Sequence, residues 1–594
     1  MYRSPVESIA FTLRNAADFE AARAEGIYGD LGADDIDAVL EEAGKFASDV
    51  IAPLNMIGDK FGTPFKDGRI TMPPGWKEAY AAWAAAGWNG LASPEQWGGQ
   101  GLPQAVNIAC IEMWNSASAA FGVGPVLTMA GIDALAGHGS DELKRIYLPK
   151  MISGEWMGTM QLTEPQAGSD VGALRTKAER AGDGTYRITG QKIFITYGEH
   201  ELTDNIIHLV LARLSDAPPG TRGISLFVVP KFLVNADGSL GARNDVRAHS
   251  IEHKMGIHAS PTCTMVYGDN GGAVGYLVGE ENRGMSYMFV MMNRARLAIG
   301  AQGVAIAEAA TQRAAAYARE RKQGRTAAMN ATQSSAIIEH VDVKRMLMTM
   351  RAMTNAARAI CYTTAVALDR SERSKDPAAR AAANERASLL TPIAKAFSTD
   401  VATEAASLGI QIHGGMGFIE ETGAAQLYRD ARITQIYEGT NGIQSIDLVM
   451  RKLPMSGGAT VRGYIGELRG IVADINAAND PAFGATGKRL GEAVDQLERA
   501  TEWLLPKIAG APEQALAGAT PYLRLFSLAT GGCMLAKDAL AATRGNGNGT
   551  LPAAPMIAAA RFFATNIAIG ASGLAETVVD GADSIDAIPT EMLG

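Results

Sequence analysis

The chain has 594 residues and a formal net charge of −9, with 54 Lys and Arg against 63 Asp and Glu. Its length predicts roughly three or four domains, and its 47% hydrophobic and 20% charged residues exclude a wholly disordered chain. The acidic total argues against nucleic acid as the main partner, because neutralising phosphates needs a basic face.

Residues 1–34 are interpreted as an N-terminal extension, and they lack the basic head and apolar core of a signal peptide. Residues 35–155 are predicted to form a helical domain, because runs such as 35–53 place apolar side chains at helical spacing. The uncharged run 113–132 carries several polar residues and Pro125, so we expect a buried helix and turn there. We therefore expect a cytoplasmic protein with no stable membrane insertion.

Residues 156–282 have a β pattern, rich in Ile, Val, Phe and Thr between turn residues. Strands are predicted over 185–198, 205–214 and 223–233. Because no helices intervene, we expect a compact antiparallel barrel or sandwich.

Residues 283–452 return to long, Ala-rich helical patterns that predict a bundle. The predicted helices cover 284–322, 336–370 and 378–407. A linker at 453–459 is followed by a helical C-terminal extension over 460–594.

Two polar segments of the β region could hold a ligand. The sequence has no intact GxGxxG, GxxxxGK[ST], CxxC or HExxH motif, so we expect no metal site, and a nucleotide cofactor must be held in another way. In the loop 160–171, Thr163, Ser169 and backbone N–H groups could cradle a phosphate or a polar ring edge, or form only a surface loop. In 191–198, Phe194 and Thr196 lie on one face of a strand, where they could flank a flat ring or simply pack.

Two further segments lie in the helical region. In 411–444, the glycines of HGGMG allow a close backbone approach, and Tyr437-Glu438-Gly439-Thr440 places a carboxylate beside a glycine. That carboxylate is either a reactive group or a solvated residue after a helix. The basic cluster 317–325 is either a solvated helix end or an anion clamp.

Five motifs in order resemble the acyl-CoA dehydrogenase family over residues 35–452. They are TEPQAGSD (163–170), KIFITYG (192–198), KMGIHASPT (254–262), QIHGGMGF (411–418) and IYEGTNGIQ (436–444). The resemblance implies an α+β multidomain fold with an α-helical N-terminal domain, a central β-barrel and a C-terminal four-helix bundle, here followed by the helical extension. It also implies FAD, bound in extended form between barrel and bundle.

The resemblance implies which residues contact FAD. The barrel-side residues are Leu162, Thr163, Ser169, Phe194 and Thr196, with Phe194 where the family usually has Trp; Thr440 is also assigned to the cofactor. Arg321 and the segment Gln411 to Gly415, with Gly414 and Gly415, are expected on the FAD of a neighbouring subunit, which implies a homodimer with shared sites, or a tetramer. The family's aromatic residue after this Arg is missing from Arg321-Lys322-Gln323-Gly324-Arg325.

Glu438 is the catalytic base that the resemblance implies. Some members carry the base on the helix after the barrel instead, but that position is Ala295 here, followed by Arg296. Glu438 would remove the α-proton of an acyl-CoA thioester while a β-hydride leaves for the flavin, and burial would raise its pKa toward the working range. Ser169, Arg296, Glu438 and Gly439 are the expected substrate contacts.

The acyl group of the substrate is predicted from three segments outside the five motifs. The opening YRSPVESIAFTLRNA, the Trp-Gly-Gly turn and the acidic helical tail resemble the bacterial group acting on 3-(methylthio)propionyl-CoA in dimethylsulfoniopropionate breakdown. Met285, Met288, Met291 and Met292 either line a thioether pocket or belong to the core. Electron-transfer flavoprotein is the expected acceptor. The alternatives are a short- to long-chain acyl-CoA dehydrogenase of fatty-acid β-oxidation, an acyl-CoA oxidase, and a DNA-associated flavoprotein.

Overall fold

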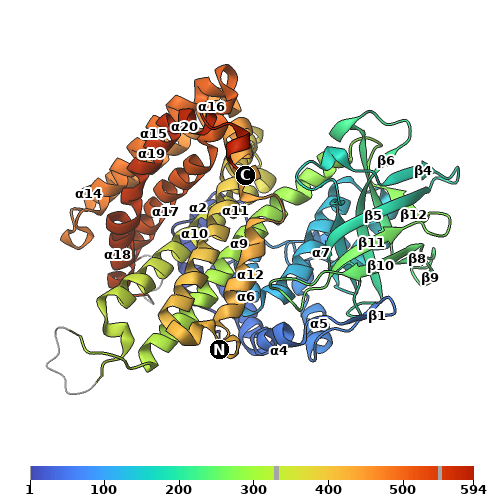
Figure 1. Cartoon of the computed structure of the whole chain (residues 1–594), viewed down its shortest axis with the longest axis horizontal. Helices are drawn as coiled ribbons and strands as arrows, with labels where there is room; N and C mark the ends of the chain where they lie inside the picture. The colour runs from blue at the N-terminus through green and yellow to red at the C-terminus, as the bar shows by residue number, and fades with distance from the viewer. Residues whose placement is uncertain (1, 327–333, 546–550) are drawn as a thin grey trace. The chain divides into compact units, whose positions relative to one another are not determined.

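The computed structural model describes residues 2–326, 334–545 and 551–594, without the side chains of 289–291 and 586. The chain divides into two compact units (Figure 1). Unit 1 comprises Met1–Lys45, Pro103–Ser116 and Arg296–Gly594, and unit 2 comprises Phe46–Leu102 and Ala117–Ala295.

Unit 2 contains the strands of the described residues. Its main sheet has eight strands: β3 (Trp156–Gln161), β4 (Lys177–Arg180), β5 (Tyr186–Thr196), β6 (Asn205–Leu214), β7 (Ile224–Pro230), β10 (Val246–Ile251), β11 (Thr262–Tyr267) and β12 (Ala273–Leu277). Two small hairpins pair β1 (Phe65–Lys66) with β2 (Arg69–Ile70) and β8 (Phe232–Val234) with β9 (Leu240–Arg243).

The main sheet closes into a ring, as predicted for a barrel. The strands β5, β12, β7 and β6 pair in that order, and the short β4 pairs with both β5 and β6, which completes the circle. The expectation of a wholly antiparallel barrel is wrong, because β6 pairs in parallel with β3 and β4. Closure leaves the ring strands no free edge.

A bulge interrupts β5 near its end. The register with β11 moves from Met265 opposite Lys192 to Cys263 opposite Ile195, so two residues of β5 oppose one of β11. Phe194, one of these two, has a φ of 60°. A non-glycine residue in this left-handed region is uncommon and marks a site where the surrounding structure holds the backbone in place.

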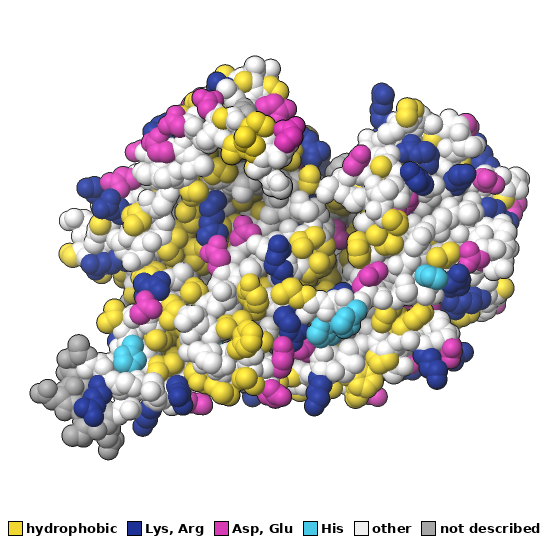
Figure 2. Space-filling view, viewed as in Figure 1, with side chains coloured by type: hydrophobic (Ala, Val, Ile, Leu, Met, Phe, Trp, Pro, Cys, Tyr) yellow, Lys and Arg dark blue, Asp and Glu magenta, His cyan; other side chains and the backbone are white. Residues whose placement is uncertain are grey.

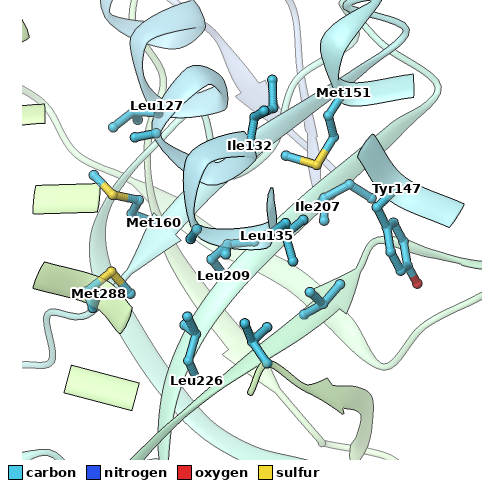
Figure 3. Packing of buried hydrophobic residues seen from close by; sticks show 14 of the residues in the cluster. Leu127, Ile132, Leu135, Tyr147, Met151, Met160, Ile207, Leu209, Leu226 and Met288 are labelled. Atoms are coloured by element: carbon cyan, nitrogen blue, oxygen red, sulfur yellow. The ribbon is translucent and has the colours of Figure 1, made fainter. Parts of the chain in front are cut away.

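The helices of unit 2 are α4 (Asn55–Phe61), α5 (Trp76–Ala85), α7 (Ala119–His138) and α8 (Asp141–Ile152). Side chains of α7 and α8 pack with the strands in one buried apolar cluster (Figure 3). Met288 belongs to this cluster, and Met285 and Met292 pack partly buried against it. Met288 is therefore a core residue, while the side chain of Met291 lies outside the described residues.

Unit 1 is helical in its described residues. Helix α9 (Gly284–Glu320) begins in unit 2 and continues in unit 1. The others are α1 (Val6–Arg14), α2 (Phe19–Ala24), α3 (Ala33–Phe46), α6 (Gln104–Ala117), α10 (Val341–Arg373), α11 (Pro377–His413), α12 (Ala424–Arg432), α13 (Asn441–Asp447), α14 (Ala459–Ala478), α15 (Thr486–Gly510), α16 (Pro512–Ala517), α17 (Ala519–Thr543), α18 (Ala553–Phe562), α19 (Ala571–Asp580) and α20 (Ala582–Asp586).

Small residues let the long helices of unit 1 pack closely. A Cβ on Gly300 of α9 would lie 2.8 Å from the Ala394 carbonyl oxygen of α11, and one on Gly303 would lie 2.6 Å from the Ser398 backbone. Because real Cβ atoms essentially never approach so closely, glycine is required at both positions. This contact fixes α9 against the part of α11 that carries Lys395.

The C-terminal extension is anchored to the start of the chain. Helices α14, α15, α17 and α19 pack together, and α17 also packs on α10 (Figure 1). Asp538 of α17 is buried and accepts hydrogen bonds from the Thr12 hydroxyl at 2.7 Å and the Ala16 N–H at 2.9 Å. Burial raises the pKa of Asp538 to about 7.

Three helical segments of the described chain have the length and apolar composition of a membrane span. The windows in Ala119–His138 and Ala519–Thr543 are 83% and 89% buried within the protein, whereas that in Ala553–Asp580 is 33% buried. The first two are therefore core helices of their units. On the face shown in Figure 2, basic and acidic side chains are interspersed.

Candidate functional site

A buried ion pair shapes the loop after β3 in unit 2. Glu164 and Lys192 are buried, with Lys192 Nζ 2.8 Å from Glu164 Oε1 and 3.0 Å from the Leu162 carbonyl oxygen. Glu164 also accepts hydrogen bonds from the Arg175 N–H at 2.6 Å and from the N–H and hydroxyl of Thr176 at 3.0 and 2.6 Å. Hydrogen bonds thus connect both ends of the loop to the Glu164–Lys192 pair.

The charge state of this pair follows from its partners. Burial alone would raise the pKa of Glu164, but Lys192 and the hydrogen bonds outweigh it and hold the pKa at about 2. Burial lowers the pKa of Lys192 to about 8. At neutral pH the pair is therefore ionised. In the loop that it holds in place, Ser169 is exposed, and Leu162 and Thr163 are half-buried.

Phe194 and Thr196 lie beside this loop. The Ile193 N–H donates to the Thr163 carbonyl oxygen at 2.9 Å, so β5 is joined to the loop next to the bulge. The Phe194 side chain is 59% exposed, whereas Ile195 is 2% exposed and Thr196 is half-buried. The structure therefore turns an aromatic ring outward beside a hydroxyl, and it excludes core packing for Phe194.

The second group of residues surrounds Glu438 in unit 1. Glu438 has a φ of 54° and Gly439 a φ of 88°, so the turn before α13 is in the left-handed region at two successive residues. A Cβ on Gly439 would lie 2.6 Å from Gln444 Nε2, which also donates to the Gly439 carbonyl oxygen at 3.2 Å. Thr440 caps α13 by accepting the Ile443 N–H at 3.2 Å. The turn fixes where Glu438 projects.

Positive charge surrounds the Glu438 carboxyl. Burial raises its pKa above the ordinary value, and Arg296 and Lys395 oppose this rise. Arg296 is 4% exposed and pairs with Asp447 at 3.6 Å. Burial lowers the pKa of Arg296, while Asp447 and Glu438 favour its charge. The result is a carboxyl group whose pKa is shifted toward the range in which a base works at neutral pH.

Two buried polar atoms of this group have no hydrogen-bond partner in the described structure. They are Arg296 Nε and Gln444 Oε1. Arg296 Nε lies 3.9 Å from the position of a Cβ on Gly439. Because a buried polar atom without a partner is costly, this donor and this acceptor beside Gly439 provide polar contacts for a ligand.

The predicted neighbour-subunit contacts form a separate group in unit 1. Gln411 and Gly414 lie at the end of α11, and the turn η8 (Gly414–Phe418) follows. A Cβ on Gly414 or Gly415 would meet nothing within 4 Å. Gln411 is 16 residues after Lys395, about 24 Å along the helix, so this group is distant from the Glu438 turn within one chain.

Arg321 follows the end of α9 and is exposed. One helical turn earlier, Tyr317 stacks on His413 with ring centroids 4.4 Å apart. The structure therefore brings the end of α9, which precedes Arg321, to the end of α11, which carries Gln411.

Four residues of these two groups were not predicted from the sequence: Glu164, Lys192, Lys395 and Asn441. The first two lie inside the motifs TEPQAGSD and QKIFITYG, so their place beside predicted site residues was the available signal. Lys395 lies in an Ala-rich helix and Asn441 directly after Thr440, and neither gave a signal by residue type. Among the described residues no group of three His, Cys, Asp or Glu side chains is arranged to hold a metal.

Family models match almost the whole chain. They are the acyl-CoA dehydrogenase N-terminal domain over residues 33–155, its middle domain over 159–270 and its C-terminal domain over 282–453. Residues 464–589 match a fourth model, acetyl-CoA dehydrogenase C-terminal like.

Curated proteins and solved structures agree with these models. A 3-methylmercaptopropionyl-CoA dehydrogenase of Ruegeria pomeroyi is 46% identical over 588 residues, which cover 98% of this chain and 99% of that protein. A butyryl-CoA dehydrogenase of Syntrophomonas wolfei is 36% identical over 91% of this chain and 90% of its own length. The structure of Caenorhabditis elegans ACDH-11 in complex with C11-CoA has a TM-score of 0.77 at 19% identity, covering 96% and 92% of the two chains, and shows a shared fold.

Proposed function

Because this chain belongs to the acyl-CoA dehydrogenase family of FAD-dependent oxidoreductases that act on the CH–CH group of acyl-CoA, we propose that Glu438 is the base that removes the α-proton. The observation that carries this proposal is the Glu438 turn itself. It is the place where a carboxyl with a raised pKa, a buried Arg and unpartnered polar atoms lie together.

The chain's own residues account for the proton transfer. A free Glu, with a pKa near 4.3, is a weak base. Burial raises the pKa of Glu438, which makes its carboxylate a stronger base, and Arg296 and Lys395 oppose this rise. The Glu438 N–H and its turn orient the thioester carbonyl, so that negative charge developing on that oxygen is stabilised. The α-proton goes to the Glu438 carboxylate.

FAD supplies the acceptor for the β-hydride and its two electrons when it is bound. The barrel residues fit such a group, because Phe194 presents an exposed ring beside Thr196, and Ser169 is exposed on the adjacent loop. We assign Leu162, Thr163, Ser169, Phe194 and Thr196 to the cofactor. Thr440 is assigned to it as well, although its hydroxyl already caps α13.

The proposed substrate is 3-methylmercaptopropionyl-CoA. The relative named for it is 46% identical and aligns over nearly the whole of both chains, including the C-terminal extension. Met288 does not supply this argument, because it lies in the core. Anaerobic titration of the enzyme with methylthiopropionyl-, butyryl- and palmitoyl-CoA tests it. The methylthiopropionyl thioester should bleach the flavin fastest, and faster bleaching by palmitoyl-CoA would reject the assignment.

The proposed electron acceptor is an electron-transfer flavoprotein. Turnover should depend on an added acceptor, with little hydrogen peroxide formed without one. Stoichiometric peroxide in air would identify an oxidase instead.

The proposed assembly is at least a homodimer. Phe418 is 86% exposed, and Met416 and Ile419 are 50% and 44% exposed around the same glycine turn. An apolar group of this kind is typical of an interface, and it adjoins Gln411, Gly414 and Gly415, which we assign with Arg321 to the FAD of the second copy.

Substitution of Glu438 tests the catalytic proposal. Glu438→Gln removes the proton acceptor but keeps the size of the side chain, so FAD should stay bound and substrate should no longer bleach it. Rapid bleaching of Glu438→Gln by methylthiopropionyl- and butyryl-CoA would refute the role of Glu438.

A further inference from the structure

Lys395 is a buried lysine without a paired carboxylate among the described residues. It lies on α11 and has a relative exposure of 0%. Its ammonium donates to Asn441 Oδ1 at 2.9 Å, and in the described part of the chain no ion pair accompanies this bond. An ammonium group in a protein interior is costly to keep charged without a paired anion. The placement of Lys395 therefore needs an explanation other than packing.

Asn441 connects Lys395 to the Glu438 turn. It is the first residue of α13 and lies three positions after Glu438. Its Nδ2 donates to Asp400 Oδ1 at 2.7 Å and to Thr399 Oγ1 at 3.0 Å. Gln435, three positions before Glu438, donates to the same Asp400 Oδ1 at 2.6 Å. Both sides of the turn are thus fastened to one stretch of α11.

Lys395 affects the ionisation of Glu438 as well as the position of the Glu438 turn. Glu438 and Asp400 favour the charged form of Lys395, and burial and Arg296 disfavour it, so its pKa falls to about 7. Lys395 in turn favours the charged form of Glu438. The ionisable groups that face Glu438, Lys395 and Arg296 from the packed elements are Tyr437, Asp400, Asp447 and Arg451.

We propose that Lys395 is the positioning residue of the catalytic carboxylate: held by Asn441, it fixes the Glu438 turn on α11 and supplies positive charge that favours ionised Glu438. This inference rests on the proposed role of Glu438 as the base. Lys395 acts through Asn441 and through its charge, and it needs no contact with the substrate.

The test compares the pH dependence of flavin bleaching in the FAD-loaded enzyme and in Lys395→Met. Methylthiopropionyl- and butyryl-CoA serve as parallel substrates, and the acid limb of kcat/KM reports the ionisation of the base. Removal of the cation should move this limb to higher pH by about one pH unit or more, because a nearby opposite charge shifts a carboxyl pKa by that amount. Lys395→Arg, which keeps the charge, should move the limb back toward the wild-type position.

Three further measurements separate this role from a structural one. The FAD content per chain should be unchanged in Lys395→Met. Lys537→Met, which removes a half-buried lysine paired with Asp18, should leave the limb in place. If Lys395→Met fails to fold, Asn441→Asp replaces it: a carboxylate beside Lys395 neutralises its charge, and the limb should again move to higher pH.

An acid limb that stays in place overturns the inference, in Lys395→Met or, where that variant does not fold, in Asn441→Asp. A lower kcat with an unmoved limb also overturns it, because a purely structural loss would give that result. Glu438→Gln, assayed in parallel, distinguishes the two proposals. If Glu438→Gln is inactive and the limb of the Lys395 variant is unmoved, only the inference about Lys395 fails; if Glu438→Gln bleaches rapidly, the role of Glu438 itself fails.

Discussion

Replacement of Glu164 by Gln should destabilise unit 2 by about 3 kcal/mol at neutral pH. The pKa of Glu164 falls from an ordinary 4.5 to about 2 in the fold, and each pKa unit corresponds to about 1.4 kcal/mol. Its side chain is 3% exposed, so solvent screening does not reduce this value. Because the folded pKa is depressed, the stabilisation is complete above the unfolded pKa and disappears as the pH falls from about 4.5 to about 2.

The loss should appear as a lower melting temperature of the FAD-loaded enzyme. About 3 kcal/mol corresponds to roughly 10 °C for a unit of this size, measured by the rise in flavin fluorescence as FAD is released. Lys192 would be left buried without its anion, so the double variant Glu164→Gln/Lys192→Met should recover part of the loss. Glu179→Gln, an exposed glutamate on the neighbouring β4, serves as the control.

Two results would refute this reasoning. A melting temperature of Glu164→Gln within about 2 °C of the wild type would mean that the ion pair contributes little to stability. A double variant no more stable than Glu164→Gln would mean that the loss does not come from the buried charge of Lys192.

The remaining predictions concern the Glu438 turn, the assembly and the C-terminal extension. Gly439→Ala should slow flavin bleaching about tenfold or more without loss of FAD, because its Cβ would lie 2.6 Å from Gln444 Nε2 in a backbone with a φ of 88°. Phe418→Asp should shift the protein to monomer in size-exclusion chromatography, since it places a charge in the proposed interface. Asp538→Asn should raise the melting temperature more at pH 8 than at pH 5: the pKa of Asp538 is raised to about 7, so its stabilising protonated form is lost as the pH rises from about 4 to 7.

For each of these three predictions, one experimental result would contradict it. Unchanged bleaching kinetics in Gly439→Ala would show that the turn tolerates a side chain. An unchanged elution volume for Phe418→Asp would place the subunit contact elsewhere. An equal change of the melting temperature of Asp538→Asn at both pH values would mean that Asp538 does not titrate between them.

The long helices were predictable because their signal is local. The range 284–322 predicted by helical spacing is close to α9 (Gly284–Glu320) as the structure has it. The ring closure was not predictable in this way, because β4 has four residues and its two partner strands come later in the sequence. Its pairing depends on distant segments rather than on its own pattern.

The site could be predicted only as far as its residue types signal chemistry. Glu438 was predicted as the base because a carboxylate beside Gly439 lies in a recognisable motif. The outward ring of Phe194 depends on a bulge, which neither the strand pattern nor the residue type encodes. Lysines are mostly exposed in proteins, so their residue type alone would place Lys192 and Lys395 on the surface. Their burial could not be predicted from the sequence.

The bond between Thr12 and Asp538 joins residues 526 positions apart, which has a consequence for biosynthesis. Unit 2 ends at Ala295, so a ribosome releases all its residues about halfway through translation, whereas unit 1 also needs segments near both ends of the chain. At 5–20 residues per second, the amphipathic helix Val6–Arg14 waits for roughly 30–100 seconds before α17 emerges. During that time the Thr12 hydroxyl and the Ala16 N–H lack their final acceptor, Asp538, and the nascent chain is a candidate client for a chaperone.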